Sequence, residues 1–203
     1  AKFNSSMVRS WGTYYNGVVI GIACYLNNDI YISGSTAVAT GIASTGAYQT
    51  ALGGSQDCFV ARFSAAGSRI WGTYYGGPQG DNHGDVATDG QGNVFLTGTT
   101  ASTTGIATAG SYQSALASSF QDVFLVKFNN AGMPQWGTYS GGPATDLGSH
   151  VIPNPRGHIY VSGYTSSSSG IASPGGYQTL FGGNYDLFIA EFNTAGNRLW
   201  ATY

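Results

Sequence analysis

The sequence is poor in charge. Of its 203 residues, 7 are Lys or Arg and 9 are Asp or Glu, which gives a formal net charge of −2. An ordinary domain carries about a quarter charged residues. Nucleic acids and anionic membrane surfaces are both bound through clustered cations, because these neutralise phosphates. We therefore expect no nucleic-acid partner.

Long apolar runs and metal-ligating clusters are also lacking. No apolar run approaches the ~18–20 residues that span a bilayer, so we expect no membrane insertion. No signal peptide precedes the first recurring segment, which favours a mature or trimmed product. Two cysteines and three histidines are too few for a disulfide framework or a structural zinc site. We expect no cofactor.

The two cysteines fall on the first and third strands expected for one sheet. One intervening strand would separate the Cα atoms of Cys24 and Cys58 by about 9–10 Å, which is beyond disulfide reach. We expect two buried free thiols.

An internal repeat dominates the rest of the sequence. Trp-Gly-Thr-Tyr begins at Trp11, Trp71 and Trp136, and Trp-Ala-Thr-Tyr begins at Trp200, with periods of 60, 65 and 64 residues. This repeat predicts one repeat domain with three full copies, at residues 11–70, 71–135 and 136–199. Residues 1–10 then contain the last strands of a partial blade, and 200–203 start the next motif.

Each copy contains four short runs typical of strands. The second run is β-branched and aromatic and ends at Gly, at residues 30–34, 94–98 and 159–163. The first runs are expected at 20–24, 86–88 and 150–152, and the third runs at 58–63, 123–128 and 187–192. Four antiparallel strands in each tandem repeat of 60–65 residues predict an all-β fold of β-propeller blades, about three and a half in number.

These motifs resemble the bacterial β-propeller repeat called SBBP. The resemblance rests on residues 71–77, 87–98, 110–113 and 122–129, and it extends over essentially the whole chain. The first copy departs from the pattern, since it lacks the Gly-Gly-Pro loop and has Tyr25-Leu26 where the hairpin turn usually has Asp-Gly. The resemblance implies a secreted or cell-surface protein of Bacteroidetes-type bacteria, and it implies no particular activity.

Most polar and aromatic residues of the repeat have a structural interpretation. The four tryptophans recur at one strand position, as residues that pack between blades would. An Asp that begins the third strand of every copy is expected to cap backbone N–H groups. The recurring aspartates are Asp57, Asp122 and Asp186.

The remaining charged positions also have a structural interpretation. Glu191 aligns with Lys2, Arg62 and Lys127, which favours a solvated edge. The isolated His150 and His158 are expected at the surface or in turns.

One segment is the best candidate for a ligand site. Asp81, His83 and Asp85 lie within five residues, and the third copy keeps Asp146 at the position of Asp81. Two carboxylates and an imidazole can ligate a metal ion. The same groups could also bind a sugar. A hydrated polar loop at the rim of the central channel is the simpler interpretation.

These observations predict a non-catalytic, extracellular propeller module that serves as a scaffold, an adhesin or a fibre-like surface component. The alternatives are a carbohydrate-binding propeller and, less favoured because the chain has only one Glu and three His, a secreted hydrolase or lyase. The expected partners are other copies of the chain, neighbouring repeats of a longer chain, or glycans.

Overall fold

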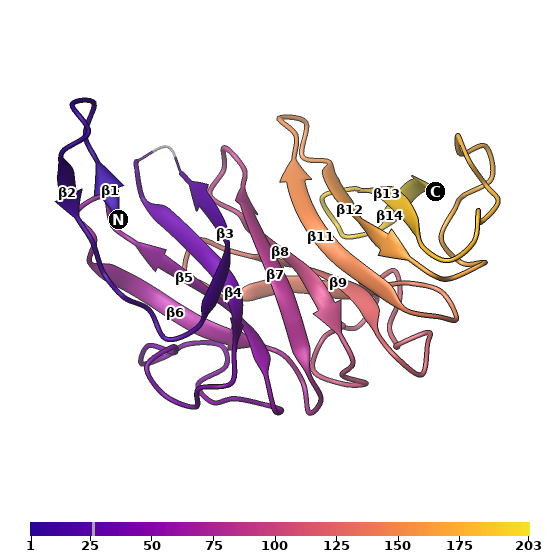
Figure 1. The fold of residues 1–203 in the computed structure, drawn as a ribbon, viewed down its shortest axis with the longest axis horizontal. Helices are drawn as coiled ribbons and strands as arrows, with labels where there is room; N and C mark the ends of the chain where they lie inside the picture. Colours follow the sequence, from indigo (N-terminus) through magenta and orange to yellow (C-terminus); the bar gives the residue numbers. More distant parts are fainter. Residues whose placement is uncertain (26) are drawn as a thin grey trace.

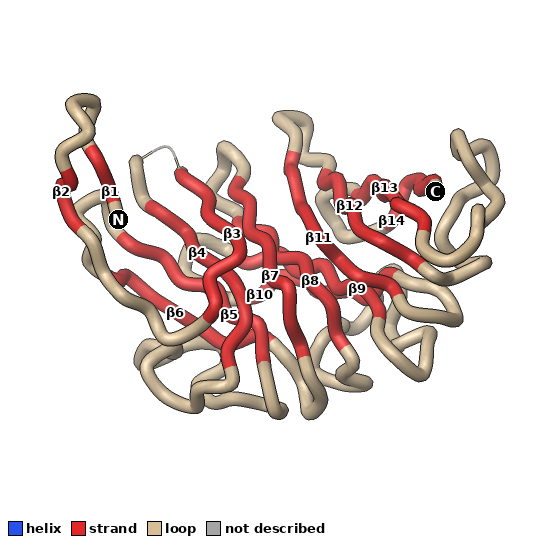
Figure 2. Tube along the Cα trace, viewed as in Figure 1, coloured by secondary structure: helices blue, strands red, loops and turns tan. Residues whose placement is uncertain are grey.

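The computed structural model describes residues 1–25 and 27–203, so that Leu26 in the unusual hairpin turn lies outside the described residues. Strands joined by loops make up this part of the chain, and no helix occurs in it (Figure 2). The strands are β1 (Lys2–Phe3), β2 (Arg9–Trp11), β3 (Val18–Cys24), β4 (Ile30–Thr36), β5 (Asp57–Phe63), β6 (Arg69–Tyr75), β7 (Asp81–Thr88), β8 (Val94–Thr100), β9 (Asp122–Phe128), β10 (Pro134–Ser140), β11 (Asp146–Pro153), β12 (Ile159–Thr165), β13 (Asp186–Phe192) and β14 (Arg198–Thr202).

The strands form three four-stranded antiparallel sheets and one hairpin. We call β3–β6 blade 1, β7–β10 blade 2, β11–β14 blade 3, and the β1–β2 hairpin the half-blade. Figure 1 shows these sheets following one another from the indigo N-terminal hairpin to the yellow C-terminal sheet, with the two termini at opposite ends. The all-β fold of propeller-like blades that the repeat predicted is thus confirmed. No helix in the described ranges is long and apolar enough to cross a membrane.

Successive blades pack through the first strand of the following blade. Strand β7 contacts β3, β4 and β5 of blade 1, and β11 contacts β7, β8 and β9 of blade 2. One hydrophobic cluster fills the junction between blades 1 and 2, and a second fills the junction between blades 2 and 3. A middle blade is therefore buried on both faces.

Strand β9 shows why its sequence is apolar at almost every position. Val123 and Leu125 belong to the cluster shared with blade 3, whereas Phe124 and Val126 belong to the cluster shared with blade 1. All four side chains are 0% exposed. A strand buried on one face would alternate apolar and polar residues instead.

A tight turn with a left-handed residue joins the third and fourth strands of each blade. Gly67, Gly132 and Gly196 occupy this position with φ of 85°, 78° and 80°. The half-blade has Met7 at the same place, with φ 61°. Glycine adopts this conformation without a steric penalty, whereas methionine does not.

The first strands are longer than the sequence predicted. They begin at Val18, Asp81 and Asp146, because the residues before the expected starts still pair with the second strands. The prediction of a polar loop at 81–85 was therefore wrong: the segment is the start of β7, interrupted by a bulge between Asn82 and Asp85. His83 lies in this bulge with φ 60°.

The two cysteines are both free, but they differ in environment. Cys58 is buried in the junction between blades 1 and 2, whereas Cys24 is exposed. The expectation that both thiols are buried was wrong for Cys24, because this last residue of β3 lines an open hollow beside Ala1 and Lys2 instead of a packed junction between four-stranded blades.

Candidate functional site

Three of the four fourth-strand tryptophans reach the turn that joins the third and fourth strands of the following blade. The indole nitrogens of Trp11, Trp71 and Trp136 donate hydrogen bonds of 3.1, 3.0 and 3.0 Å to backbone carbonyl oxygens of that turn. The acceptors belong to Ala65, Asn130 and Thr194. We call this contact the tryptophan latch, and it occurs at the three junctions between the described sheets.

The indole ring of each latch covers the left-handed glycine of the same turn. A Cβ atom added to Gly132 would lie 2.9 Å from two ring atoms of Trp71. The same test on Gly67 and Gly196 gives 2.7 Å to Trp11 and 2.8 Å to Trp136. Glycine at this position therefore serves both the backbone conformation and the close approach of the ring. Trp200 at the end of the series is 38% exposed.

The aspartate that begins each third strand accepts hydrogen bonds from the preceding loop. Asp57 accepts from the backbone N–H groups of Gly53 and Gly54, at 2.8 and 3.2 Å, and from the side-chain amide of Gln49. The same loop-to-carboxylate bonds recur in the other blades, where the donors are Ala117 and Gln113 for Asp122 and Gly182 and Gln178 for Asp186.

A second carboxylate lies beside this one at both complete junctions. Asp81 and Asp146 are 0% exposed, and each accepts from a glycine N–H and a serine hydroxyl. A Cβ atom added to Gly76 would lie 2.6 Å from Asp81 and 2.7 Å from Asp57, and Gly141 stands in the same relation to Asp122 and Asp146. We call Asp57 with Asp81, and Asp122 with Asp146, the junction carboxylate pairs.

Burial destabilises the charged form of the carboxyl groups in these pairs. Burial is the main cause that raises the pKa of Asp81, and the Asp57 carboxylate raises it further. Burial likewise raises the pKa of Asp122, with a further rise caused by Asp146. One oxygen of Asp81 and one of Asp122 have no hydrogen-bond partner among the described residues. Both features favour a proton on each pair.

The pairs predict that the blades unfold more easily as the pH rises. A carboxyl whose folded pKa is raised stabilises the fold fully below its unfolded pKa, about 4, and loses this contribution as the pH rises through the folded pKa. We expect the urea midpoint to fall between pH 4 and the raised pKa values. The double variant Asp81→Asn/Asp146→Asn should flatten this dependence, and an unchanged slope in circular-dichroism titrations would contradict it.

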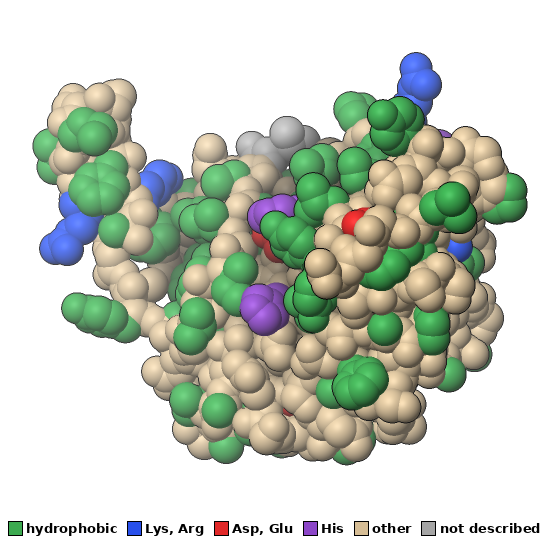
Figure 3. All heavy atoms as spheres, turned by 45° about the vertical axis from the view of Figure 1, so that its right-hand side comes forward, with side chains coloured by type: hydrophobic (Ala, Val, Ile, Leu, Met, Phe, Trp, Pro, Cys, Tyr) green, Lys and Arg blue, Asp and Glu red, His purple; other side chains and the backbone are tan. Residues whose placement is uncertain are grey.

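The polar segment that sequence analysis singled out divides between two environments. Asp81 is buried in the junction, whereas His83 is exposed and Asp85 is half-buried on the first strand. The Asp85 carboxylate accepts the backbone N–H of Val151 from blade 3, and His150 lies 3.5 Å from it. Figure 3 shows histidine and acidic side chains close together on this side of the molecule, among hydrophobic ones. Within the described ranges, no three His, Cys, Asp or Glu side chains are arranged to hold a metal ion.

Two side-chain contacts of the third strands were not predicted from the sequence. Arg62 pairs with Asp29 at 2.6 Å, and Glu191 bonds to His158 at 2.6 Å and accepts from Tyr160 at 2.9 Å. Glu191 is 8% exposed, so the interpretation of this position as a solvated edge was wrong. His158 is not isolated either. Its bond to Glu191 lowers the pKa of the carboxyl, and Tyr160 lowers it further.

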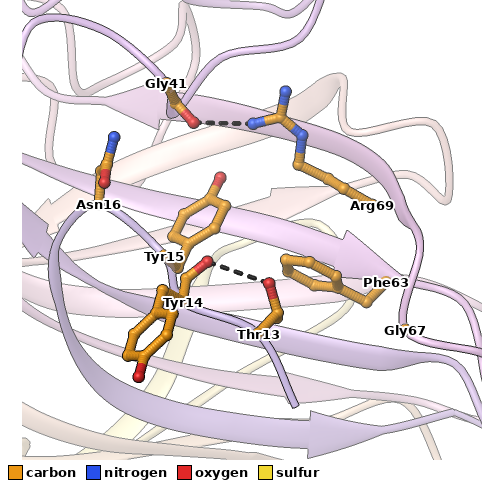
Figure 4. Close-up of a pocket in the computed structure, with 8 residues that line it drawn as sticks. All are labelled: Thr13, Tyr14, Tyr15, Asn16, Gly41, Phe63, Gly67 and Arg69. Carbon is orange, nitrogen blue, oxygen red and sulfur yellow. Dashed lines mark hydrogen bonds between the residues drawn. The ribbon is translucent and has the colours of Figure 1, made fainter. Parts of the chain in front are cut away.

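A pocket of about 260 Å³ lies where the half-blade meets blade 1. One side of the pocket is formed by the segment 13–16, which follows β2. The other side is formed by residues of blade 1, namely Gly41, Phe63, Gly67 and Arg69. Figure 4 shows the Tyr14 ring pointing away from the Tyr15 ring, and the Arg69 guanidinium bonded to the Gly41 carbonyl oxygen. The Tyr15 hydroxyl donates to the carbonyl of Ile42 in blade 1. We call this the N-terminal pocket.

Repeated four-stranded sheets, latched in series by tryptophan, define a β-propeller repeat protein. In agreement, residues 70–105 match the family model of the SBBP beta-propeller repeat. The matched segment covers β6 to β8 and thus spans the junction between blades 1 and 2. No curated protein matches the chain.

Proposed function

We propose that the chain is a non-catalytic structural module at a bacterial cell surface, which acts by stacking its blades on further blades of the same kind. Such a module would serve as a scaffold, an adhesin or a fibre-like component. The exterior location rests on the resemblance of the repeat to those of secreted and surface proteins. The stacking is proposed because one face of blade 3, on the side away from blade 2, exposes apolar side chains.

The observation that carries the proposal is the exposure of two apolar side chains on β13. Leu187 is 63% and Ile189 46% exposed. Their equivalents in blade 1, Cys58 and Val60, and in blade 2, Val123 and Leu125, are all 0% exposed because the next blade covers them. Blade 3 thus presents to solvent the surface that its sister blades bury. Exposed apolar patches of this kind mark sites of association.

Carbohydrate binding is the second candidate. It is favoured by polar side chains that lie on the first strands of blades 2 and 3. Asp85 and His150 are 3.5 Å apart, and His83 on the same strand as Asp85 is exposed. Sugars are bound by such hydrogen-bonding groups when apolar side chains lie beside them. A glycan array read at millimolar sensitivity, with Asp85→Ala as the comparison, tests this candidate.

Stacking predicts that the chain associates in solution. Light scattering at micromolar concentration should give masses above the 21.0 kDa of one chain. The variant Leu187→Glu places a charge on the exposed face and should shift the population to monomers, because burying that charge is costly.

The matched control is Ile70→Glu. Ile70 is 47% exposed on β6, the last strand of blade 1, away from the face of blade 3. This variant should associate like the unmodified chain. A stable 21.0 kDa monomer at every concentration would overturn the stacking proposal.

A further inference from the structure

The hairpin turns between the first and second strands of blades 2 and 3 lie next to each other and line one pocket. They are residues 89–93, between β7 and β8, and residues 154–158, between β11 and β12, and both lie on one edge of the molecule (Figure 1). Each has a left-handed glycine at its fourth position, Gly92 with φ 87° and Gly157 with φ 85°. The corresponding turn of blade 1 begins at Tyr25. These turns therefore stand at equivalent places of the repeat.

At the junction of blades 1 and 2, a tyrosine fills the space between the two turns. Tyr25 packs against the hydrophobic cluster of this junction. A Cβ atom added to Gly92 would lie 3.2 Å from the Tyr25 hydroxyl oxygen and 3.5 Å from the ring carbon that carries it. The Thr88 hydroxyl also donates to the Cys24 carbonyl at 3.0 Å, which joins the ends of β7 and β3. This junction is thus closed by a phenol ring and by a hydrogen bond.

The equivalent place between blades 2 and 3 has no such ring. Asp89 occupies the repeat position of Tyr25. Within the described part of the chain, a Cβ atom added to Gly157 would meet only an atom of Thr194, in its own blade, at less than 4 Å. Gly157 is accordingly half-buried, whereas Gly92 is buried. The ring that covers the glycine at one junction is therefore replaced by open space at the next.

A pocket of about 400 Å³ occupies this space, and we call it the turn pocket. Small-molecule sites have volumes of about 300–1,000 Å³. Pro153 and Pro155 supply apolar walls, while Gly90 and Gly157 line the pocket without side chains. Pro153 stands at the position of Thr88 and has no hydroxyl to bridge the two strand ends. The walls thus suit a flat apolar group.

The Asp89 carboxylate is the polar group that the turn pocket offers to a hydrogen-bond donor. Its Oδ1 accepts the backbone N–H groups of Gln91 and Asn93, both at 2.9 Å, and its Oδ2 accepts the Asn93 side-chain amide at 2.6 Å. A carboxylate has about four acceptor positions. These bonds hold the carboxylate in place and use three positions, which leaves one on Oδ2 for a ligand.

We propose that the turn pocket binds a phenol ring, of the kind that a tyrosine side chain carries. The ring lies over Gly157, as the Tyr25 ring lies over Gly92, and its hydroxyl donates to the Asp89 carboxylate. A phenol combines the apolar body and the single polar group that these walls match. The inference goes beyond the proposed stacking function, since the turn pocket lies between two complete blades of the chain and needs no further blade.

N-acetyl-tyrosinamide tests the site on the full chain. In nitrogen-15 chemical-shift titrations it should bind saturably to one site, with the largest shifts in residues 88–93 and 153–158. N-acetyl-phenylalaninamide lacks the hydroxyl and should bind about tenfold more weakly, the size of effect expected when a hydrogen bond to a charged group is lost.

A pentapeptide with tyrosine between pairs of glycines distinguishes two sources of the ring. Stronger binding of the pentapeptide than of the amide would support the site with a polypeptide as the natural source. Equal binding would support it with a free phenolic compound as the source.

Variants at Asp89 test the geometry. Asp89→Tyr introduces the residue that fills the equivalent space in blade 1, so it should abolish binding and raise the urea midpoint. Asp89→Asn keeps the turn, because the Asn154 side chain accepts the same two kinds of backbone bond in blade 3. This variant should weaken tyrosinamide binding toward that of phenylalaninamide and leave phenylalaninamide binding unchanged.

Two exposed positions of the β11–β12 turn provide a variant and its control. Pro155→Ala removes one apolar wall and should weaken binding of both amides without altering the fold, since Pro155 is exposed. Arg156→Ala changes the neighbouring exposed side chain, which does not line the turn pocket, and should bind normally.

The outcomes also separate this site from association through blade 3. The Leu187→Glu chain should bind tyrosinamide as tightly as the unmodified chain. No saturable binding, shifts centred outside the two turns, or binding that Asp89→Tyr and Pro155→Ala leave unchanged would overturn the turn pocket. Tighter binding of methyl glucoside than of tyrosinamide would overturn it too, because the site would then be one for sugars.

Discussion

Replacing Trp71 by alanine should lower the free energy of unfolding by about 3–5 kcal/mol, the cost of removing a large buried aromatic side chain. Trp71 is 9% exposed, covers Gly132 of the next blade and packs edge-on against Tyr31 at 6.0 Å. Its loss would leave a cavity at a junction that holds two blades together, and would remove the indole hydrogen bond to the Asn130 carbonyl.

Trp200→Ala is the matched control for this variant. Trp200 occupies the same repeat position, but it is 38% exposed and lies on the last strand of the described chain. We expect a loss of about 1 kcal/mol or less there, as for most surface substitutions. Urea unfolding followed by far-ultraviolet circular dichroism measures both. Equal effects of the two substitutions would contradict the tryptophan latch.

Adding one methyl group at Gly132 should cost about 2–4 kcal/mol, the sum of backbone strain and overpacking. Gly132 has φ 78°, a conformation that alanine adopts only under strain. The new Cβ would also lie 2.9 Å from the Trp71 ring.

The double variant Gly132→Ala/Trp71→Ala separates the two causes. Once the ring is gone, the alanine meets no clash there, so the double variant should be more stable than the two single losses together imply. Gly90→Ala serves as the control, because its Cβ would meet nothing within 4 Å. Strict additivity in the cycle would show that the ring and the turn do not touch.

The tryptophans illustrate what a repeat reveals in a sequence. Their constant position identified the fourth strand, but nothing in the sequence identified their partners. The acceptors are backbone carbonyls of Ala65, Asn130 and Thr194, three residues with unrelated side chains. A backbone carbonyl can accept from the indole whatever side chain its residue carries, so the acceptor residues could not be recognised in the sequence.

The aspartates of the first and third strands show a second limit. Asp81 and Asp85 read as one polar cluster, yet the bulge between them sends one into the junction and leaves the other beside His150. The partner of Asp81 is Asp57, which belongs to the previous blade. Pairing across a junction depends on how the blades are placed, which local patterns do not encode.

Glu191 shows that some missed contacts were within reach. Strands β12 and β13 pair Tyr160 directly with Glu191. This register could have been predicted by aligning the two hydrophobic runs antiparallel to each other from the glycine that ends the second run. The alignment with Lys2, Arg62 and Lys127 drew attention to the change of charge and away from the neighbouring strand. Position within a sheet was the better guide.

Met7 gives the series of blades a direction. The turns that receive a tryptophan have glycine at this position, and a Cβ atom there would lie within 3.0 Å of the indole ring. Met7 has such a Cβ atom, with its backbone in the same left-handed conformation. The half-blade is thus built to donate a tryptophan but not to receive one. The tryptophan latch therefore runs in one direction along the described blades, from each fourth strand to the turn of the blade that follows it.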